Sequence, residues 1–207
     1  MRAWCLGLGV VATLSSGGCD AVYGLSGRDA AVVDTATDAI DATHEQCPAD
    51  YAPIANAPAG SSYRIVEMEN GRWLLGFVDC RNDTTTGVTH LVVFDDVIEL
   101  EAIKRALPPP PSKGAAWVSW AGYARPPHSD PLLFSTVTGG DISSTDPLWG
   151  LSEPNNGNGN GAKEETVVWI GNNISGLIDA PYDKVVNGYV CECDGIPTAL
   201  IDIDPEP

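Results

Sequence analysis

Two stretches of the chain place apolar or small residues at helical spacing. Between residues 72 and 81, four such residues stand at i, i+3, i+4 and i+7 on one face of a predicted helix: Trp73, Gly76, Phe77 and Cys80. A second helix is predicted to begin at Asp96, because Glu99 follows three residues later and the two can form a capping box. The inward stripe of this second helix is predicted to be Val97, Leu100, Ile103 and Leu107. Four prolines, at 108–111, end it, because proline lacks the backbone N–H that a helix needs.

Short apolar runs elsewhere predict β-strands. The runs cover residues 63–68, 91–94, 115–120, 167–170 and 188–193. After residue 120 these short runs are joined by long loops. Two early helices combined with later strands and long loops indicate an α+β domain.

The chain begins with the pattern of an export signal. Arg2 is followed by an apolar stretch up to Leu14 and then by small residues, which is typical of a signal peptide over residues 1–18. The sequence L-S-S-G-G-C, which ends at Cys19, resembles the lipobox of bacterial lipoproteins. That resemblance implies a lipid on Cys19 and an exported protein anchored in a membrane of the cell envelope, facing outward. The alternative is a plain secretory signal.

Composition divides the remainder of the chain into three parts. Residues 19–46 are rich in Ala, Asp and Thr, so they are predicted to form an acidic disordered tether. Residues 47–195 are predicted to form the folded domain, and residues 196–207 an acidic tail.

The charge of the chain limits its partners. The formal net charge is −17, which argues against nucleic acid, because nucleic-acid binding needs a basic surface. It also argues against electrostatic docking to anionic lipid, so membrane contact is expected only through the lipid on Cys19. Divalent cations and neutral partners remain.

The six cysteines indicate an oxidising compartment. None of them forms a C-x-x-C pair, so zinc-finger and thioredoxin-like sites have no support. Cys5 belongs to the signal peptide, and Cys19 is the predicted lipid attachment site. The other four are far apart in the chain, which favours long-range disulfides.

The segment from Trp149 to Ile170 is dense in oxygen-bearing side chains. Glu153 and Asn155 flank Pro154, an Asn/Gly run follows, and Glu164 and Glu165 precede a short apolar strand. Calcium prefers six to eight oxygen ligands, so this loop is a candidate calcium site. The alternative is a turn with solvated glutamates.

Taken together, residues 47–195 resemble a C-type lectin-like domain. The resemblance rests on motifs in family order, from the Trp73–Cys80 helix to Leu91–Phe94, Trp117–Trp120, Trp149 four residues before Glu-Pro-Asn, and Tyr189-Val190-Cys191-Glu192. It implies a C-type lectin-like fold of two helices, antiparallel sheets and a long loop region. It also implies disulfides Cys80–Cys191 and Cys47–Cys193. A further family bridge is absent, because its positions fall on Thr166 and Tyr182.

The same resemblance implies which residues bind calcium. In the family, Glu-Pro-Asn with a cis proline holds one ion, which binds two vicinal hydroxyls of mannose-type sugars. Carried over, the metal ligands are Glu153, Asn155, Glu164 (or Glu165 in its place) and Asp179, and the sugar ligands are Glu153, Asn155 and Glu164. The family's Trp-Asn-Asp motif is reduced here, since Ile178 stands in place of its Asn and only Asp179 remains.

Two functions follow as expectations. The first is a calcium-dependent, mannose-type carbohydrate-binding module on the cell surface. The second is a calcium-independent protein-binding or adhesion module on the same fold. An enzyme is not expected, because no Ser or Cys nucleophile has a recognisable base and His90 adjoins a buried strand.

Overall fold

The structure, a computed structural model, describes residues 47–112, 115–126, 129–156 and 167–199. The side chains of Glu69 and Asn70 are outside this description. All the described residues fall in one of two units into which the chain divides, residues 35–207.

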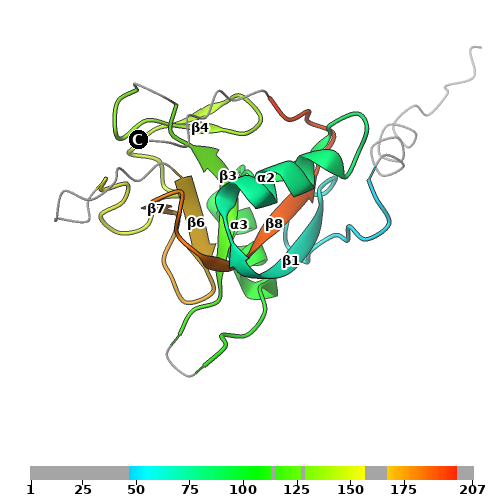
Figure 1. Cartoon of the computed structure of the whole chain (residues 1–207), viewed down its shortest axis with the longest axis horizontal. Coiled ribbons are helices and arrows are strands. Elements are labelled where there is room, and N and C mark those ends of the chain that lie inside the picture. Colours follow the sequence, from blue (N-terminus) through cyan, green and yellow to red (C-terminus); the bar gives the residue numbers. More distant parts are fainter. Residues whose placement is uncertain (1–46, 113–114, 127–128, 157–166, 200–207) are drawn as a thin grey trace, which may run out of the picture. The chain divides into compact units, whose positions relative to one another are not determined.

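The described residues form two helices and eight strands (Figure 1). In chain order these are β1 (Ser62–Gly71), α2 (Trp73–Asn82), β2 (Thr89–Leu91), α3 (Val97–Ala106), β3 (Val118–Ala124), β4 (Phe134–Thr136), β5 (Asp141–Ile142), β6 (Val167–Gly171), β7 (Ile178–Ala180) and β8 (Val186–Cys193). The predicted α+β class is therefore confirmed.

Helix α2 buries the face that its sequence predicts. Trp73, Gly76, Phe77 and Cys80 are its buried residues. A Cβ atom on Gly76 would lie only 2.9 Å from Cγ of Tyr189 in β8. The absence of a side chain at Gly76 therefore lets the helix pack closely on the sheet.

Helix α3 is capped by Asp96, whose carboxylate accepts hydrogen bonds from the backbone N–H groups of Ile98 and Glu99. The other half of the predicted box is displaced by one residue, because Glu99 accepts from the N–H of Asp95. The predicted inward face of α3 is wrong at Val97, whose exposed fraction is 42%. At about 100° per residue, Val97 lies about 120° around the helix from the buried Ile103.

Two strands differ in extent from the predicted apolar runs. β2 covers Thr89–Leu91 instead of residues 91–94, and β3 covers Val118–Ala124 instead of residues 115–120. Pairing sets these limits: β2 is opposite β8 from Thr89, while β3 continues to Ala124 along β4 and β6. An apolar run shows which residues are buried but not where a partner strand begins.

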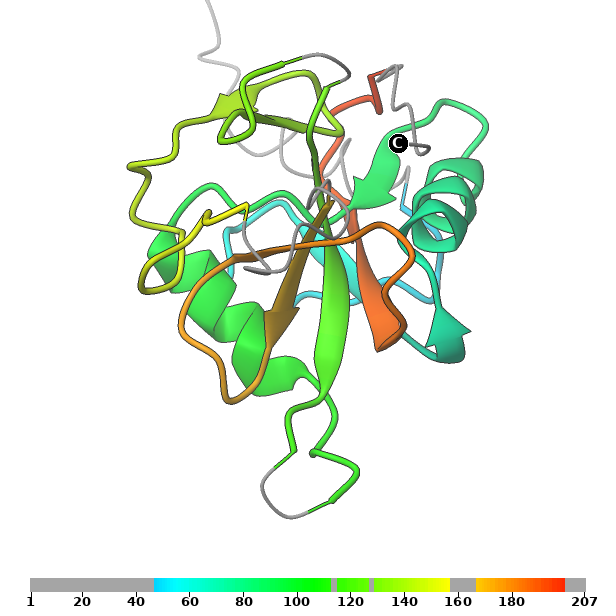
Figure 2. The same ribbon diagram turned by 60° about the vertical axis from the view of Figure 1, so that its left-hand side comes forward.

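The strands form one mixed sheet. Its main order is β1-β8-β3-β4-β5, with β2 paired to β8 and with β6 paired to β3 and β7. The pairs are antiparallel except β3 with β8, which is parallel. Figure 2 shows β3 between β6 and β8, with which it pairs.

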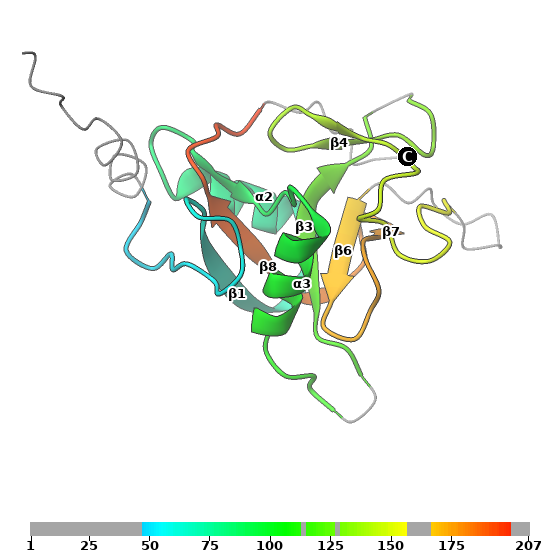
Figure 3. The same cartoon turned by 180° about the vertical axis from the view of Figure 1, so that it is seen from behind.

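The core consists of two clusters on opposite faces of the sheet, because successive strand residues point to opposite sides. One cluster contains Leu100 and Ile103 of α3 with Val190 of β8. The other contains Trp73 of α2 with Tyr189 of β8. Figure 3 shows α2 and α3 on either side of β3 and β8.

Two disulfides join the ends of the folded part, as the resemblance predicted. Cys80 of α2 is bonded to Cys191 of β8, 111 residues apart, and Cys47 is bonded to Cys193, 146 residues apart. Both bridges therefore connect the start of the fold to its last strand.

The described residues after β8, 194–199, pack back on the domain. The N–H of Thr198 donates to the carbonyl of Gly87 at 2.8 Å, and that of Ala199 donates to the carbonyl of Val137 at 2.7 Å. Residues 196–199, predicted as the start of the tail, thus make contacts with the domain. None of the helices in the described part of the chain is long and apolar enough to cross a membrane.

Candidate calcium and sugar site

The loop that carries Glu-Pro-Asn is fixed beside β7 by backbone hydrogen bonds. The N–H of Gly150 donates to the carbonyl of Leu177 at 2.9 Å, and the N–H of Leu177 donates to the carbonyl of Leu148 at 2.8 Å. Trp149 and Leu177 form an isolated parallel bridge there. The two loop segments predicted to share a site are therefore adjacent in the fold.

Gly176 permits this close approach. Its φ is +71°, and a Cβ atom at this position would lie 2.4 Å from the backbone nitrogen of Gly150. Both the backbone conformation and the available space therefore require glycine at this position.

Trp149 packs beneath the loop instead of presenting its ring for a sugar. It is 8% exposed, and its ring lies at a tilt on Phe134 with the centroids 5.2 Å apart. Its indole N–H donates to the carbonyl of Ser143. The ring of Trp169 in β6 has the Lys184 ammonium 4.2 Å from its centroid.

Glu153 and Asn155 form a pair at the protein surface. The Glu153–Pro154 peptide bond is cis, as the resemblance predicted, and Pro154 is buried while Asn155 is exposed. The side-chain amide of Asn155 donates to both carboxylate oxygens of Glu153, each at 2.9 Å. The proline thus lies in the interior, and the two polar side chains face each other at the surface.

The buried Asp179 holds the backbone next to the Glu153–Asn155 pair. It lies in β7 and is 2% exposed. Its Oδ1 accepts from the N–H of Asn155 at 3.1 Å, and its Oδ2 accepts from the N–H of Asn156 at 2.8 Å. A buried carboxylate needs such partners, so Asp179 fixes the backbone that carries Asn155.

Arg125 is a residue of this region that sequence reasoning missed. It follows the last residue of β3 and is 6% exposed, and its Nη1 donates to Oδ1 of Asn156 at 2.9 Å and to the carbonyl of Pro131 at 3.3 Å. The sequence signal that could have identified Arg125 is a charged residue directly after the apolar run of β3. A buried arginine needs acceptors, and loop carbonyl and amide oxygens supply them.

The structure brings three of the predicted site residues together: Glu153, Asn155 and Asp179. Glu164 and Glu165 lie outside the described residues. Ile178, in place of the family's Asn, is partly buried in β7 and offers no side-chain oxygen.

The donor set of the loop fits a hard cation. Glu153 and Asp179 supply carboxylates, and Asn155 supplies a carbonyl oxygen if its amide rotates by half a turn. Each carboxylate oxygen has two lone pairs, so one accepted hydrogen bond does not by itself keep that oxygen from binding a cation. Oxygen-only donors suit calcium better than zinc.

Comparisons with known proteins rest on structure alone. No protein-family model matches the chain, and no curated protein matches it in sequence. The human scavenger receptor C-type lectin carbohydrate-recognition domain superposes with a TM-score of 0.52 at 17% identity, over 72% of this chain and 98% of that chain. The fold is that of a C-type lectin domain.

Other C-type lectin folds agree with this assignment. The C-type lectin CEL-I from Cucumaria echinata gives a TM-score of 0.53 at 18% identity, over 71% of this chain and 96% of that one. The cow carbohydrate-recognition domain of CD23, whose structure was determined in the presence of a GlcNAc2Man3 oligosaccharide, gives 0.51 at 18% identity, over 70% and 94%. These C-type lectin domains are covered almost completely, so this chain contains the whole fold.

Proposed function

We propose that this protein is a calcium-dependent carbohydrate-binding module that recognises mannose-type sugars. The observation that carries the proposal is the surface pair of Glu153 and Asn155, which flank a cis proline and rest on the buried Asp179. This arrangement matches the Glu-Pro-Asn motif that the resemblance assigns to calcium and sugar binding.

The ion would be held by Glu153, Asn155 and Asp179, with Glu164 or Glu165 completing the protein ligands. A bound calcium ion supplies a positive centre that two neighbouring sugar hydroxyls can coordinate. Glu153 accepts a hydrogen bond from one such hydroxyl, and the amide of Asn155 donates to the other. Without a side-chain oxygen at position 178, we expect weak calcium affinity, with a Kd of about 0.1–1 mM as in extracellular calcium modules.

The proposed location is the outer surface of the cell envelope. Export by the signal peptide, a lipid on Cys19 and the tether of residues 19–46 would display the domain outside the cell, where its partner is a glycan. All of these residues precede the described part of the chain. The two disulfides are consistent with an oxidising compartment.

Calcium titration of the purified chain by isothermal calorimetry tests the site. We expect one equivalent to bind, and we expect Glu153→Gln to abolish binding while keeping the shape of the side chain. Glu67→Gln, an exposed position on β1, is the matched control and should bind as the parent does. A flat titration of the parent chain, or equal binding by Glu153→Gln, would contradict the proposal.

A second candidate is a calcium-independent protein-binding module on the same fold. Ile178 favours it, because one oxygen ligand of the family's shell is missing. In that case, partner binding would persist in EGTA and in the Glu153→Gln variant. Loss of partner binding in either condition would exclude it.

A further inference from the structure

A second group of potential metal ligands, separate from Glu153, Asn155 and Asp179, lies where β2 pairs with the end of β8. In the antiparallel pair of β2 and β8, His90 is directly opposite Glu192. Opposed residues share a face, and Asp194 follows two residues after Glu192, so strand alternation carries it toward the same side. The sequence positions are far apart, and only the strand pairing brings these side chains together.

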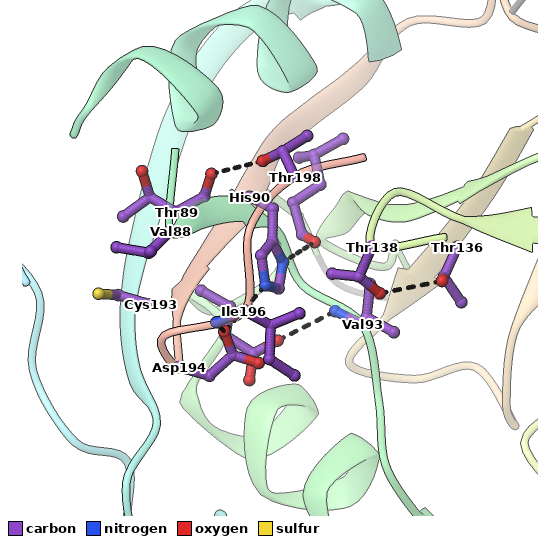
Figure 4. A network of polar contacts seen from close by, with 12 residues as sticks. Val88, Thr89, His90, Val93, Thr136, Thr138, Cys193, Asp194, Ile196 and Thr198 are labelled. Carbon is purple, nitrogen blue, oxygen red and sulfur yellow. Dashed lines mark hydrogen bonds and ion pairs between the residues drawn. The ribbon is translucent and has the colours of Figure 1, made fainter. Parts of the chain in front are cut away.

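The three side chains converge on one point. Nε2 of His90 lies 3.1 Å from Oδ1 of Asp194, as Figure 4 shows. One ligand atom from each of His90, Glu192 and Asp194 lies within 4.8 Å of the others. Tetrahedral zinc with ligands at about 2.0–2.1 Å separates its ligand atoms by about 3.3 Å. The His90–Asp194 distance already fits that spacing, and Glu192 needs to approach by about 1.5 Å at most.

The imidazole of His90 is oriented as a metal-binding histidine requires. Its Nδ1 lies 2.9 Å from the carbonyl oxygen of Leu91, which can only accept, so Nδ1 carries the proton. In the neutral ring, Nε2 therefore presents its lone pair toward Asp194. A backbone carbonyl that fixes the tautomer in this way is one of the common outer partners of a metal-binding histidine.

Glu192 contributes a buried carboxylate with one described hydrogen bond. Its side chain is 3% exposed, and Oε2 accepts from the N–H of Val93 at 3.1 Å. No hydrogen bond reaches Oε1 from any residue that the structure describes. A carboxylate in a buried residue is costly to keep charged, so a proton or a cation is expected beside it.

The local charge also favours a cation. Burial raises the pKa of Glu192 to about 8, with the nearby charges of Glu99 and Asp194 adding to the effect of burial. Burial acts to lower the pKa of His90, but the bond to Asp194 and the charge of Glu192 outweigh it and raise the pKa.

We propose that His90, Glu192 and Asp194 form a binding site for a zinc-class divalent transition metal. One imidazole with two carboxylates suits such a metal, whereas calcium prefers a shell of oxygens only. Asp194 has 16% side-chain exposure, so the ion can enter past it and a water molecule can complete the tetrahedron.

The metal would fix the segment directly after β8, residues 194–198, to the sheet. Asp194 also accepts from the N–H of Ile196, and Thr198 donates its hydroxyl proton to the carbonyl of Thr89 beside His90 (Figure 4). Coordination by Asp194 and His90 would therefore join the segment after β8 to β2. This role is independent of sugar binding.

The described residues contain one more group of potential metal ligands, but that group is not a comparable metal site. Asp79, Asp83 and the sulfur of Cys191 lie close together, but Cys191 is in a disulfide. Asp79 and Asp83 already form ion pairs with Arg64. The guanidinium of Arg64 therefore already supplies the positive charge that balances Asp79 and Asp83.

Zinc titration of the purified full chain, by calorimetry and by thermal unfolding, tests the proposal. We expect one equivalent of Zn²⁺ to bind and an excess of about 100 times Kd to raise the Tm by about 5 °C or more. Calorimetry at pH 7 in two buffers of different ionisation enthalpy should show proton release on binding, because a metal displaces protons from its ligands.

Variants separate this site from the Glu-Pro-Asn loop. Asp194→Asn keeps the shape of a partly exposed side chain and should weaken zinc at least about tenfold, and His90→Gln should do the same if it folds. Glu153→Gln is the matched control and should keep parental zinc binding. The proposal is overturned if the parent chain binds no zinc at 1 mM, if Asp194→Asn binds as the parent does, or if Glu153→Gln alone removes binding.

Discussion

At the scale of single residues, the candidate sugar site depends on a buried carboxylate beneath exposed ligands. The two oxygens of Asp179 accept the backbone N–H groups of Asn155 and Asn156. Glu153 and Asn155 are thereby held at the surface in a fixed relation to each other. The buried Asp179, which a sugar cannot reach, therefore positions Glu153 and Asn155 at the surface.

Asp179→Asn tests this supporting role. The amide can accept through only one of its two ends, so one of the two backbone N–H groups loses its acceptor and faces an NH₂ group. We expect a loss of about 1–3 kcal/mol in the free energy of unfolding, measured with urea in the presence of EGTA. Asp95→Asn, at an exposed position, should change stability by less than about 0.5 kcal/mol. Equal effects of the two variants would contradict the assignment.

The buried Glu192 makes stability depend on pH in the metal-free protein. Its pKa is raised from 4.5 to about 8, chiefly by burial. The titratable groups that face it come from β1, β2, α3, β3 and the segment after β8: Tyr63, His90, Glu99, Tyr123 and Asp194. Because the folded state holds this proton more tightly, the contribution is complete below about pH 4.5 and is lost as pH rises through about 8. The raised pKa of His90 acts in the same direction.

Urea unfolding between pH 5 and pH 9, in the presence of a chelator, measures this dependence. We expect stability to fall by at least about 1 kcal/mol as pH rises. Glu192→Gln, which cannot titrate, should show a smaller slope. Stability that rises with pH, or an unchanged slope in the variant, would disagree with the assignment.

At the scale of elements, sequence patterns predicted what is buried better than where elements pair. The i, i+3, i+4, i+7 spacing identified the buried face of α2 completely. Strand limits were less accurate, since β2 and β3 are delimited by their partners and not by their own apolar runs. Arg125 and Asp194 were not predicted to matter, because their contacts join segments that are far apart in the sequence. Such contacts cannot be derived from local periodicity.

Gly176→Ala tests how the loop is attached to β7. Gly176 and Gly87 have nearly equal φ values of +71° and +70°, but only Gly176 has backbone atoms within 4 Å of the position of a Cβ. Both alanine variants should lose about 1 kcal/mol for the left-handed backbone. Gly176→Ala should lose further stability because its Cβ collides with Gly150. Thermal unfolding of both variants gives the comparison, and similar Tm losses would argue against the close approach.

At the scale of the whole molecule, two disulfides and the parallel β3–β8 pair join early and late parts of the chain. The resemblance to C-type lectin-like domains, which rests on motifs in the same order along the chain, predicted both disulfides. Cysteine spacing alone left the pairing open. The same resemblance predicted the cis peptide bond at Pro154. The family pattern therefore supplied the long-range information that periodicity lacks.

Removal of Cys80–Cys191 by a double substitution to alanine should cost about 2–5 kcal/mol, because the bridge closes a long loop of the unfolded chain. Urea unfolding of the Cys80→Ala, Cys191→Ala variant against the parent chain measures the loss. Unfolding that is unchanged would show that this bridge does not restrict the unfolded state.

The central claim is that Glu153 and Asn155 present calcium to a sugar. Its most direct test is equilibrium binding of a mannose-terminated glycan to the purified chain, in 5 mM calcium and in EGTA. The account predicts saturable binding in calcium that is lost in EGTA and in Glu153→Gln, while Glu67→Gln binds as the parent does. Binding that is the same in calcium, in EGTA and in Glu153→Gln would contradict it.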